Sequence, residues 1–263
     1  MKSKKIPSSY DIIGSREKAV AIIEIPEEFE KKKKEIAQEI LTRHKNVKSV
    51  LKKISERKGI FRTRELEFLL GDKNTEVVHK ESGCLFKLNP RKVYFSGREG
   101  TERLRIANQI NPKEIVMLMF AGVGIYGIII AKKQPQVKKI ISIEINPLAF
   151  EYLKENIRMN KLEDKIIPIL GDVKEKCKDW YGKCDRIIMP LPHEAENFLS
   201  TANECLKPEG GFIHLYIIEK EENLEKRAEK IKDRIKKKID FKVNTVLPYA
   251  PRTNKYCIDM RLF

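Results

Sequence analysis

The sequence predicts an α/β protein of two parts, in which a smaller α+β domain over residues 1–108 precedes an open, mostly parallel sheet over residues 109–263. After Pro112, apolar strands alternate regularly with helices, which is typical of a parallel sheet with helices on both faces. The length of 263 residues also exceeds the commonest size of a single domain. We therefore expect two domains joined near residues 108–112.

The first domain is expected to mix strands and helices. Apolar runs over residues 10–25 predict two strands with a turn near Gly14. From residue 27 onward, apolar residues recur at helical spacing and predict two helices that break near Lys45. The remaining elements are strands over residues 77–100, with turns at Gly83 and Asn89-Pro90, and a helix over residues 101–110.

The second domain is expected to follow a strand and helix order that ends in an antiparallel hairpin. The expected strands are residues 114–120, 138–145, 165–172, 184–191, 210–218, 241–251 and 256–263. The expected helices are residues 127–133, 147–160, 195–206 and 222–239.

The net charge of +16 favours a polyanionic partner, because clustered lysine and arginine attract nucleic acid through long-range field and counterion release. Residues 1–110 hold 26 lysines and arginines against 16 aspartates and glutamates, so most of the excess lies in the expected first domain. The alternative is a charged surface that reflects genome composition or thermophily. The concentration of charge favours binding of nucleic acid.

The spacing of cysteine and histidine and the length of the apolar runs argue against a metalloprotein, a secreted protein and a membrane protein. The five cysteines and four histidines lack the spacing of a metal or redox motif, so we expect no metal and reduced, buried thiols. No apolar run is long enough to cross a bilayer, and the N-terminal residues lack the apolar core of a signal peptide. We therefore expect a cytoplasmic protein without a membrane partner.

The ends of successive strands carry the candidate site, because ligands of open α/β sheets bind beyond the carboxyl ends of the strands. The first strand ends in "FAGVGIYG", and Glu144 follows Gly122 by 22 residues, which suits a carboxylate that accepts hydrogen bonds from a ribose. Asp172 ends the third strand, and "MPLPH" ends the fourth. Both a dinucleotide and S-adenosylmethionine contain adenosine, so these positions suit either ligand. The missing third glycine of the dinucleotide fingerprint favours S-adenosylmethionine. Glycines, two acidic residues and a proline-rich motif at the ends of four strands are typical of a class I, Rossmann-like methyltransferase domain.

A set of ordered motifs resembles one family. "FRTRELEFLLGD", "VYFSGREGTERLRIA", "MFAGVGIYGI", "ISIEINPLAFEYLKENIRMN", "RIIMPLP" and "YAPRTNKYCIDMRLF" resemble the archaeal and eukaryotic tRNA (guanine-37 N1)-methyltransferases and their wyosine-pathway relatives, from about Tyr10 onward. The resemblance implies transfer of a methyl group from S-adenosylmethionine to N1 of guanosine at tRNA nucleotide 37. It also implies a first domain that contacts the anticodon stem-loop. We expect a monomer.

The resemblance assigns the residues of the site. Glu102 matches the general base and Arg62 the cation that stabilises charge on the target base, with Arg64 as a competitor; a glutamate at this position could instead serve the helix N-terminus. Pro190 and Pro192 are placed at the catalytic site, where they are expected to fix the backbone so that its carbonyl groups point into the cleft. The residues expected to contact the cofactor are Tyr94, Phe120, Gly122, Gly124, Glu144, Ile145, Asp172, Val173 and Pro190.

Two positions depart from the family pattern. Leu118 stands where many members have an aspartate, and Pro190-Leu191-Pro192 replaces an asparagine-first motif. The proline-first version is similar to that of an archaeal subgroup that also methylates C7 of the tricyclic wyosine precursor, so we expect this second activity. The alternatives are an aminocarboxypropyl transferase that uses the same cofactor and a non-catalytic tRNA-binding protein.

Overall fold

The structure, a computed structural model, describes residues 9–235 and 238–263. It divides into two compact units between Gly97 and Arg98. The boundary predicted at residue 108 therefore lies too far along the chain. The intervening helix α2 (Gly100–Ala107) packs against α3 (Ile125–Lys133) of the second unit, because its buried apolar residues need that partner.

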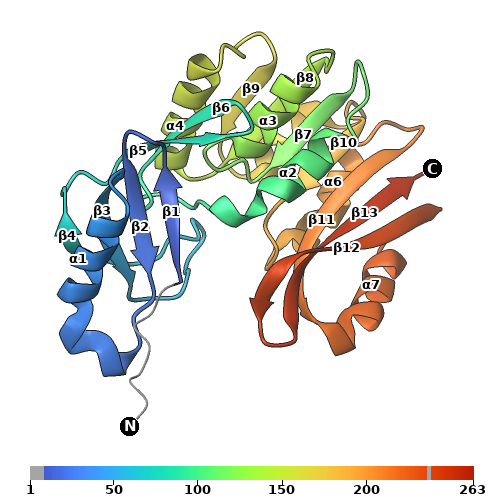
Figure 1. The fold of residues 1–263 in the computed structure, drawn as a ribbon. Helices are drawn as coiled ribbons and strands as arrows, with labels where there is room; N and C mark the ends of the chain where they lie inside the picture. Colours follow the sequence, from blue (N-terminus) through green and yellow to red (C-terminus); the bar gives the residue numbers. More distant parts are fainter. Residues whose placement is uncertain (1–8, 236–237) are drawn as a thin grey trace. The chain divides into compact units, whose positions relative to one another are not determined.

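The first unit contains a four-stranded sheet in the order β1-β2-β3-β4 and a separate hairpin of β5 and β6 (Figure 1). The helix α1 (Lys33–Arg43) connects β2 to β3, which are parallel, and its buried residues Ile36, Ala37 and Ile40 pack on the sheet. The other pairs are antiparallel. The strands are β1 (Tyr10–Gly14), β2 (Ala19–Ile23), β3 (Val47–Lys53), β4 (Leu66–Gly71), β5 (Val77–Glu81) and β6 (Cys84–Leu88), and a 3-10 helix, η1, spans Glu27–Lys32.

Two local predictions in this unit are wrong. The segment of β3 is predicted as a second helix, since the helical spacing of apolar residues extends to Val47. Pairing with β2 on one side and β4 on the other makes it a strand. No strand forms between Asn89 and α2. There, Lys92 and Val93 donate their backbone N–H groups to the Asn89 carbonyl oxygen in a turn. In both cases hydrogen bonds to the backbone, which sequence spacing does not reveal, decide the structure.

The second unit is a seven-stranded sheet between helices, as the alternating pattern predicts (Figure 1). Its strands are β7 (Ile115–Met119), β8 (Lys139–Glu144), β9 (Ile166–Leu170), β10 (Arg186–Met189), β11 (Gly211–Lys220), β12 (Ile239–Ala250) and β13 (Thr253–Leu262). Its further helices are α4 (Pro147–Met159), α5 (Val173–Lys176), α6 (Leu199–Cys205) and α7 (Leu224–Asp233), with 3-10 turns η3 (Lys178–Trp180), η4 (Ala195–Phe198) and η5 (Glu221–Asn223). The 3-10 turn η2 (Gly97–Glu99) contains the point of division.

The strand order is β12-β13-β11-β10-β7-β8-β9. The five strands from β11 to β9 are parallel, and β13 pairs antiparallel with both β11 and β12. The predicted terminal hairpin is confirmed, and its second strand lies inside the sheet. Residues of β13 therefore have neighbours on both sides and contribute to the core.

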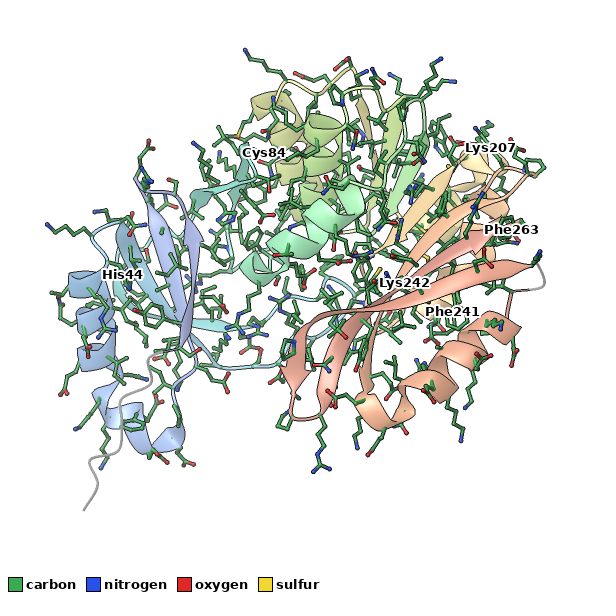
Figure 2. All side chains as sticks on the ribbon, turned by 45° about the vertical axis from the view of Figure 1, so that its right-hand side comes forward. His44, Cys84, Lys207, Phe241, Lys242 and Phe263 are labelled. Atoms are coloured by element: carbon green, nitrogen blue, oxygen red, sulfur yellow. The ribbon has the colours of Figure 1, made fainter. Side chains whose placement is uncertain are left out.

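Side chains alternate between the two faces of this sheet. On one face, Met119 of β7 and Met189 of β10 belong to a core that includes residues of α5, α6 and α7. Figure 2 labels Phe241 and Lys242, successive residues of β12, and the Phe241 ring packs against this core. On the other face, Gly127 of α3 lies close to Ser142 of β8. No helix within the described residues has the length and apolar character needed to cross a membrane.

Candidate functional site

The glycine turn between β7 and α3 combines a strained backbone with open space. Phe120 has a φ of 62°, which is uncommon for a residue with a side chain, and Gly122 and Gly124 have φ values of 56° and 92°. A Cβ added at Gly122 would meet no atom within 4 Å, whereas one at Gly124 would lie 2.5 Å from Leu153 Cδ1. Gly122 therefore faces space that a ligand can fill, and Gly124 allows the turn to pack on α4.

Alanine substitutions separate these two roles. Gly124→Ala is expected to reduce stability more than Gly122→Ala, because it adds a clash with Leu153 to the backbone cost of about 1–2 kcal/mol that both replacements share. Gly122→Ala is expected to fold and to weaken cofactor binding. Thermal unfolding and calorimetric titration measure the two effects; equal losses of stability would contradict this division of roles.

Glu144 ends β8 beside the glycine turn. Its Oε2 accepts a hydrogen bond from the backbone N–H of Gly122 at 2.5 Å, and its Oε1 accepts one from the N–H of Asn146 at 2.7 Å. Burial raises the pKa of this carboxyl group, and the backbone hydrogen bonds oppose the rise. The Ile145 N–H also bonds this carboxylate, so about one of its four lone pairs remains to accept a ribose hydroxyl.

The other predicted strand-end residues surround this edge of the sheet. Asp172 is half-buried after β9 and caps α5, because its Oδ1 accepts the N–H of Lys174 at 2.8 Å. Ile145 is half-buried, and Val173 belongs to the core. Half-buried Pro190 and Pro192 follow β10, and neither has an N–H, so both offer only carbonyl oxygens to a ligand.

The strand register brings these positions into one row. Met119 pairs with Ile143, Ile188 with Leu118, and Met189 with Leu215. The next residue on each strand is Phe120, Glu144, Pro190 or Tyr216, so these four residues lie side by side at the carboxyl edge. Because neighbouring strands are about 4.8 Å apart, Tyr216 lies about 10 Å from Phe120 across the sheet.

Glu102 connects α2 to that row. Its side chain is 6% exposed, and its Oε1 accepts hydrogen bonds from the Tyr216 hydroxyl at 2.6 Å and from Arg105 Nη2 at 2.8 Å. Its Oε2 accepts Arg105 Nε at 2.7 Å. Since a carboxylate offers about four lone pairs, one remains on Oε2. The side chain thus bonds Arg105 and Tyr216 and does not cap its own helix.

Arg62 belongs to the first unit and occupies a tight turn. Its N–H donates to the Gly59 carbonyl oxygen at 3.1 Å, its φ is 51°, and the neighbouring Phe61 is 42% exposed. Arg64 differs, because its Nε is buried and has no hydrogen-bond partner among the described residues. A strained residue at an exposed turn is a candidate for function, which favours Arg62 over Arg64.

Tyr94, also in the first unit, is held by Arg57. The guanidinium carbon of Arg57 lies 3.9 Å from the centroid of the Tyr94 ring, and Arg57 Nη2 donates to the Phe95 carbonyl oxygen at 2.9 Å. Tyr94 remains 37% exposed. Its ring is therefore supported by Arg57 and is not packed in the core.

Sequence reasoning missed the polar residues that surround Glu102. Tyr216 and His214 lie on β11, and Asp259 lies on β13, within strands that are otherwise apolar. All of them are buried or half-buried. The sequence signal for them is a histidine inside the apolar strand "GGFIHLYII" and an aspartate inside "YCIDMRLF". Buried polar residues need hydrogen-bond partners, so both indicate a polar cluster.

One cluster has metal-ligand chemistry, although no metal is predicted. Donor atoms of His214, Cys257 and Asp259 lie within 4.8 Å of one another. His214 Nε2 lies 2.8 Å from Arg186 Nη1, and an arginine only donates, so Nε2 accepts and the ring proton is on Nδ1, 2.6 Å from Asp259 Oδ1. Both ring nitrogens are thereby engaged, and two neighbouring guanidinium groups disfavour a cation.

The chain is similar to known tRNA-modifying enzymes. Residues 77–244 match the TRM5/TYW2 methyltransferase domain, and residues 2–75 match the TYW2 N-terminal domain. The tRNA (guanine(37)-N(1))-methyltransferase Trm5b of Pyrococcus abyssi is 42% identical over 98% of this chain and 76% of its own length. The tRNA(Phe) (4-demethylwyosine(37)-C(7)) aminocarboxypropyltransferase of Methanocaldococcus jannaschii is 37% identical over 87% of this chain and 93% of its own length. The tRNA (guanine(37)-N(1))/4-demethylwyosine(37)-methyltransferase Taw22 of Nanoarchaeum equitans is 31% identical over 95% of this chain and its full length.

Solved structures agree with these relatives. The chain is similar to aTrm5 in its complex with tRNALeu, with a TM-score of 0.85 and 40% identity over 98% of this chain and 73% of that one. It is also similar to M. jannaschii TYW2 in complex with AdoMet, with a TM-score of 0.71 and 30% identity over 96% of this chain and 98% of that one. The family model covers more than half of the chain, and the motifs of the glycine turn and of α2 lie within it. The chain therefore belongs to the TRM5/TYW2 methyltransferase family.

Proposed function

We propose that this protein is a tRNA (guanine-37 N1)-methyltransferase that uses S-adenosylmethionine and takes up the anticodon stem-loop as a cytoplasmic monomer. The proposal rests on Glu102, a buried carboxylate with one free lone pair that accepts a hydrogen bond from Tyr216 of β11, beside the residues that follow β7 and β10. The relatives named for this activity support the same assignment.

The cofactor site is proposed at the glycine turn. Gly122, which has no Cβ, leaves space for the ligand. Glu144 accepts a hydrogen bond from a ribose hydroxyl, and Asp172 accepts one from the adenine amino group. The backbone around the cofactor is assigned to Phe120, Gly124, Ile145, Val173 and Pro190. Tyr94 is also assigned to S-adenosylmethionine. S-adenosylmethionine, when bound, supplies a methyl group that is susceptible to nucleophilic attack.

The reaction requires removal of a proton, because N1 of guanine is protonated at neutral pH and lacks a free electron pair for attack. Oε2 of Glu102 is the proposed acceptor of this proton. Arg62 is proposed to stabilise the negative charge that develops on the guanine O6, and Pro190 and Pro192 to orient the base. Since the donor site is at the sheet edge, the target base must leave the anticodon loop stack.

Methyl transfer from labelled S-adenosylmethionine tests the proposal. A tRNA transcript with guanosine at nucleotide 37 should yield N1-methylguanosine, and the same transcript with adenosine there should yield no product. Nucleoside mass analysis identifies the product. Cofactor binding without transfer to either transcript would refute the proposed activity and would favour a reaction on an already modified base.

A second activity is proposed at C7 of the tricyclic wyosine precursor at the same nucleotide. Pro190-Leu191-Pro192 lacks the asparagine amide of the commoner motif, so the base-binding surface is less polar and accommodates a larger base. The bifunctional relative supports this activity. tRNA that carries the precursor tests it: addition of a methyl group supports the proposal, whereas addition of the heavier aminocarboxypropyl group would identify the transferase alternative.

Affinity for tRNA is expected to fall steeply with salt, because residues 1–110 carry most of the excess positive charge and binding releases condensed counterions. Between 50 and 200 mM salt we expect a loss of about tenfold or more. Equilibrium binding to labelled tRNA measures the slope, with S-adenosylmethionine affinity as the control. A slope near zero would contradict a role for this charge in binding.

A further inference from the structure

A chain of hydrogen bonds extends from Glu102 through the interior of the second unit. Arg105 bonds Glu102 through Nε and Nη2, and it also bonds Asp259 through Nη1 at 2.5 Å and Nη2 at 3.2 Å. One guanidinium group thus serves two carboxylates. Asp259 continues to His214, and His214 continues to Arg186.

At the far end of this hydrogen-bond chain, Arg186 donates to several acceptors. Arg186 is 1% exposed, and its Nε and Nη2 donate to the two carboxylate oxygens of Glu114 at 2.8 and 2.9 Å. Its Nη2 also donates to the Gln109 carbonyl oxygen at 2.8 Å. Arg186 and Glu114 therefore neutralise each other, and the pair fixes the acceptor nitrogen of His214.

His214 holds Asp259 ionised without carrying a charge itself. Burial lowers the pKa of His214 against the opposing effect of Asp259, which matches the neutral ring with its proton on Nδ1. Burial also opposes ionisation of Asp259, but hydrogen bonds from His214 and Arg105 outweigh it and place the Asp259 pKa below its usual range. Asn244 Nδ2 donates a further bond to Asp259 at 3.0 Å. Asp259 is therefore a fixed negative charge.

The charges around Glu102 identify what Asp259 contributes. When Glu102 is ionised, Arg105 faces two carboxylates. When Glu102 takes up the guanine N1 proton, the N1–H bond breaks, its electron pair stays on N1, and Glu102 becomes neutral. Arg105 cannot lose its proton, because a guanidinium group stays charged in proteins, so it needs another anion at that moment. Asp259 is that anion.

We propose that Asp259, oriented by His214, is the positioning residue that balances Arg105 and thereby allows Glu102 to take up a proton. This inference rests on the proposed function. Without Asp259, Arg105 would pair with Glu102 alone, and protonation of Glu102 would leave a half-buried cation without its counter-ion.

Other charged and titratable groups near Glu102 do not replace Asp259. Glu99 is engaged by Lys255, whose Nζ lies 2.7 Å from its Oε2. Tyr216 and Tyr126 are buried, and burial raises the pKa of both hydroxyl groups, so they stay neutral. Among the described residues, Arg103, a cation on α2, and Cys257, whose pKa is raised by burial, also lie in this region.

Two substitutions should move the pH dependence of methyl transfer in opposite directions. Asp259→Asn removes the second anion and makes protonation of Glu102 harder, so the rate falls about tenfold and the acid limb of the pH–rate profile moves to lower pH by about one unit. Arg105→Gln removes the cation and makes protonation easier, so the acid limb moves to higher pH. The KM for tRNA should stay within about twofold of wild type in both.

Single-turnover methylation between about pH 5 and pH 9, at saturating tRNA and labelled cofactor, provides the profiles. Asp185→Asn is the matched control, because Asp185 pairs with Lys207 (labelled in Figure 2) and with the Ile115 N–H, at the opposite end of β10 from Pro190. Its profile should keep the wild-type midpoint.

The outcomes separate the inference from the proposed function. If wild-type protein transfers no methyl group to guanosine 37, the proposed function fails first. If wild type is active, an unchanged acid limb in Asp259→Asn, or a shift to higher pH, overturns the inference. Should Asp259→Asn fail to fold by thermal unfolding, an unshifted profile in Arg105→Gln still overturns the inference, because it excludes charge balance around Glu102.

Discussion

Replacement of Glu102 by glutamine is expected to reduce methyl transfer to guanosine 37 by about 10²- to 10⁴-fold, the range typical for loss of a general base. The amide keeps the size of the side chain but cannot accept the N1 proton. It also places an N–H group against Arg105 or Tyr216, which both donate to the carboxylate. Single-turnover kinetics with saturating tRNA and cofactor measures the loss.

Affinity for S-adenosylmethionine should change little in Glu102→Gln, because the carboxylate is assigned to the target base and not to the cofactor. Thr101→Ala is the matched control on the same turn of α2, since Thr101 is exposed. It should retain nearly full activity. A Glu102→Gln enzyme that methylates at the wild-type rate would show that another group takes the proton.

Glu144→Gln is expected to weaken cofactor binding by about 10- to 100-fold, because hydrogen bonds to a buried charged group are worth about 1.5–3 kcal/mol. The NH2 group of the glutamine would also face the backbone N–H of Gly122 or Asn146, so that two donors meet without an acceptor. Calorimetric titration with S-adenosylmethionine measures the affinity. Glu151→Gln, on the exposed face of α4, is the control and should bind normally.

The same residue predicts a pH dependence of cofactor affinity. Burial raises the Glu144 pKa, so on acidification this carboxylate is protonated before an exposed one. Protonation removes acceptor capacity for a ribose hydroxyl, and affinity falls as the pH drops through that raised pKa. Glu144→Gln should lack this dependence. An identical pH profile in both proteins would show that a different group accepts the ribose.

Local patterns predicted the residues at strand ends well, because each signal is confined to a few neighbouring positions. An apolar run followed by glycines fixes the turn at Gly122, and the spacing to Glu144 follows from one strand, one helix and one strand. The helix α2 was predicted but assigned to the wrong unit, since its burial against α3 depends on packing partners that the sequence does not show.

The network behind Glu102 could not be predicted in the same way. Arg105 and Asp259 are 154 residues apart, and His214 and Asp259 are 45 residues apart. Their contacts depend on the insertion of β13 beside β11, which sets His214 opposite Asp259 in the register. The sequence shows that polar residues occur in apolar strands, but it does not show which residues they contact.

The parallel register that aligns Phe120, Glu144, Pro190 and Tyr216 also affects how the protein folds. β7 is flanked by β8 and β10, and β10 is more than sixty residues further along the chain. Contacts between distant segments form slowly, because the intervening loops lose conformational entropy before the strands pair. Local helices can form early, whereas the row of residues at the sheet edge is complete only when the central strands have assembled. Catalytic competence is therefore among the last properties that this chain acquires during folding.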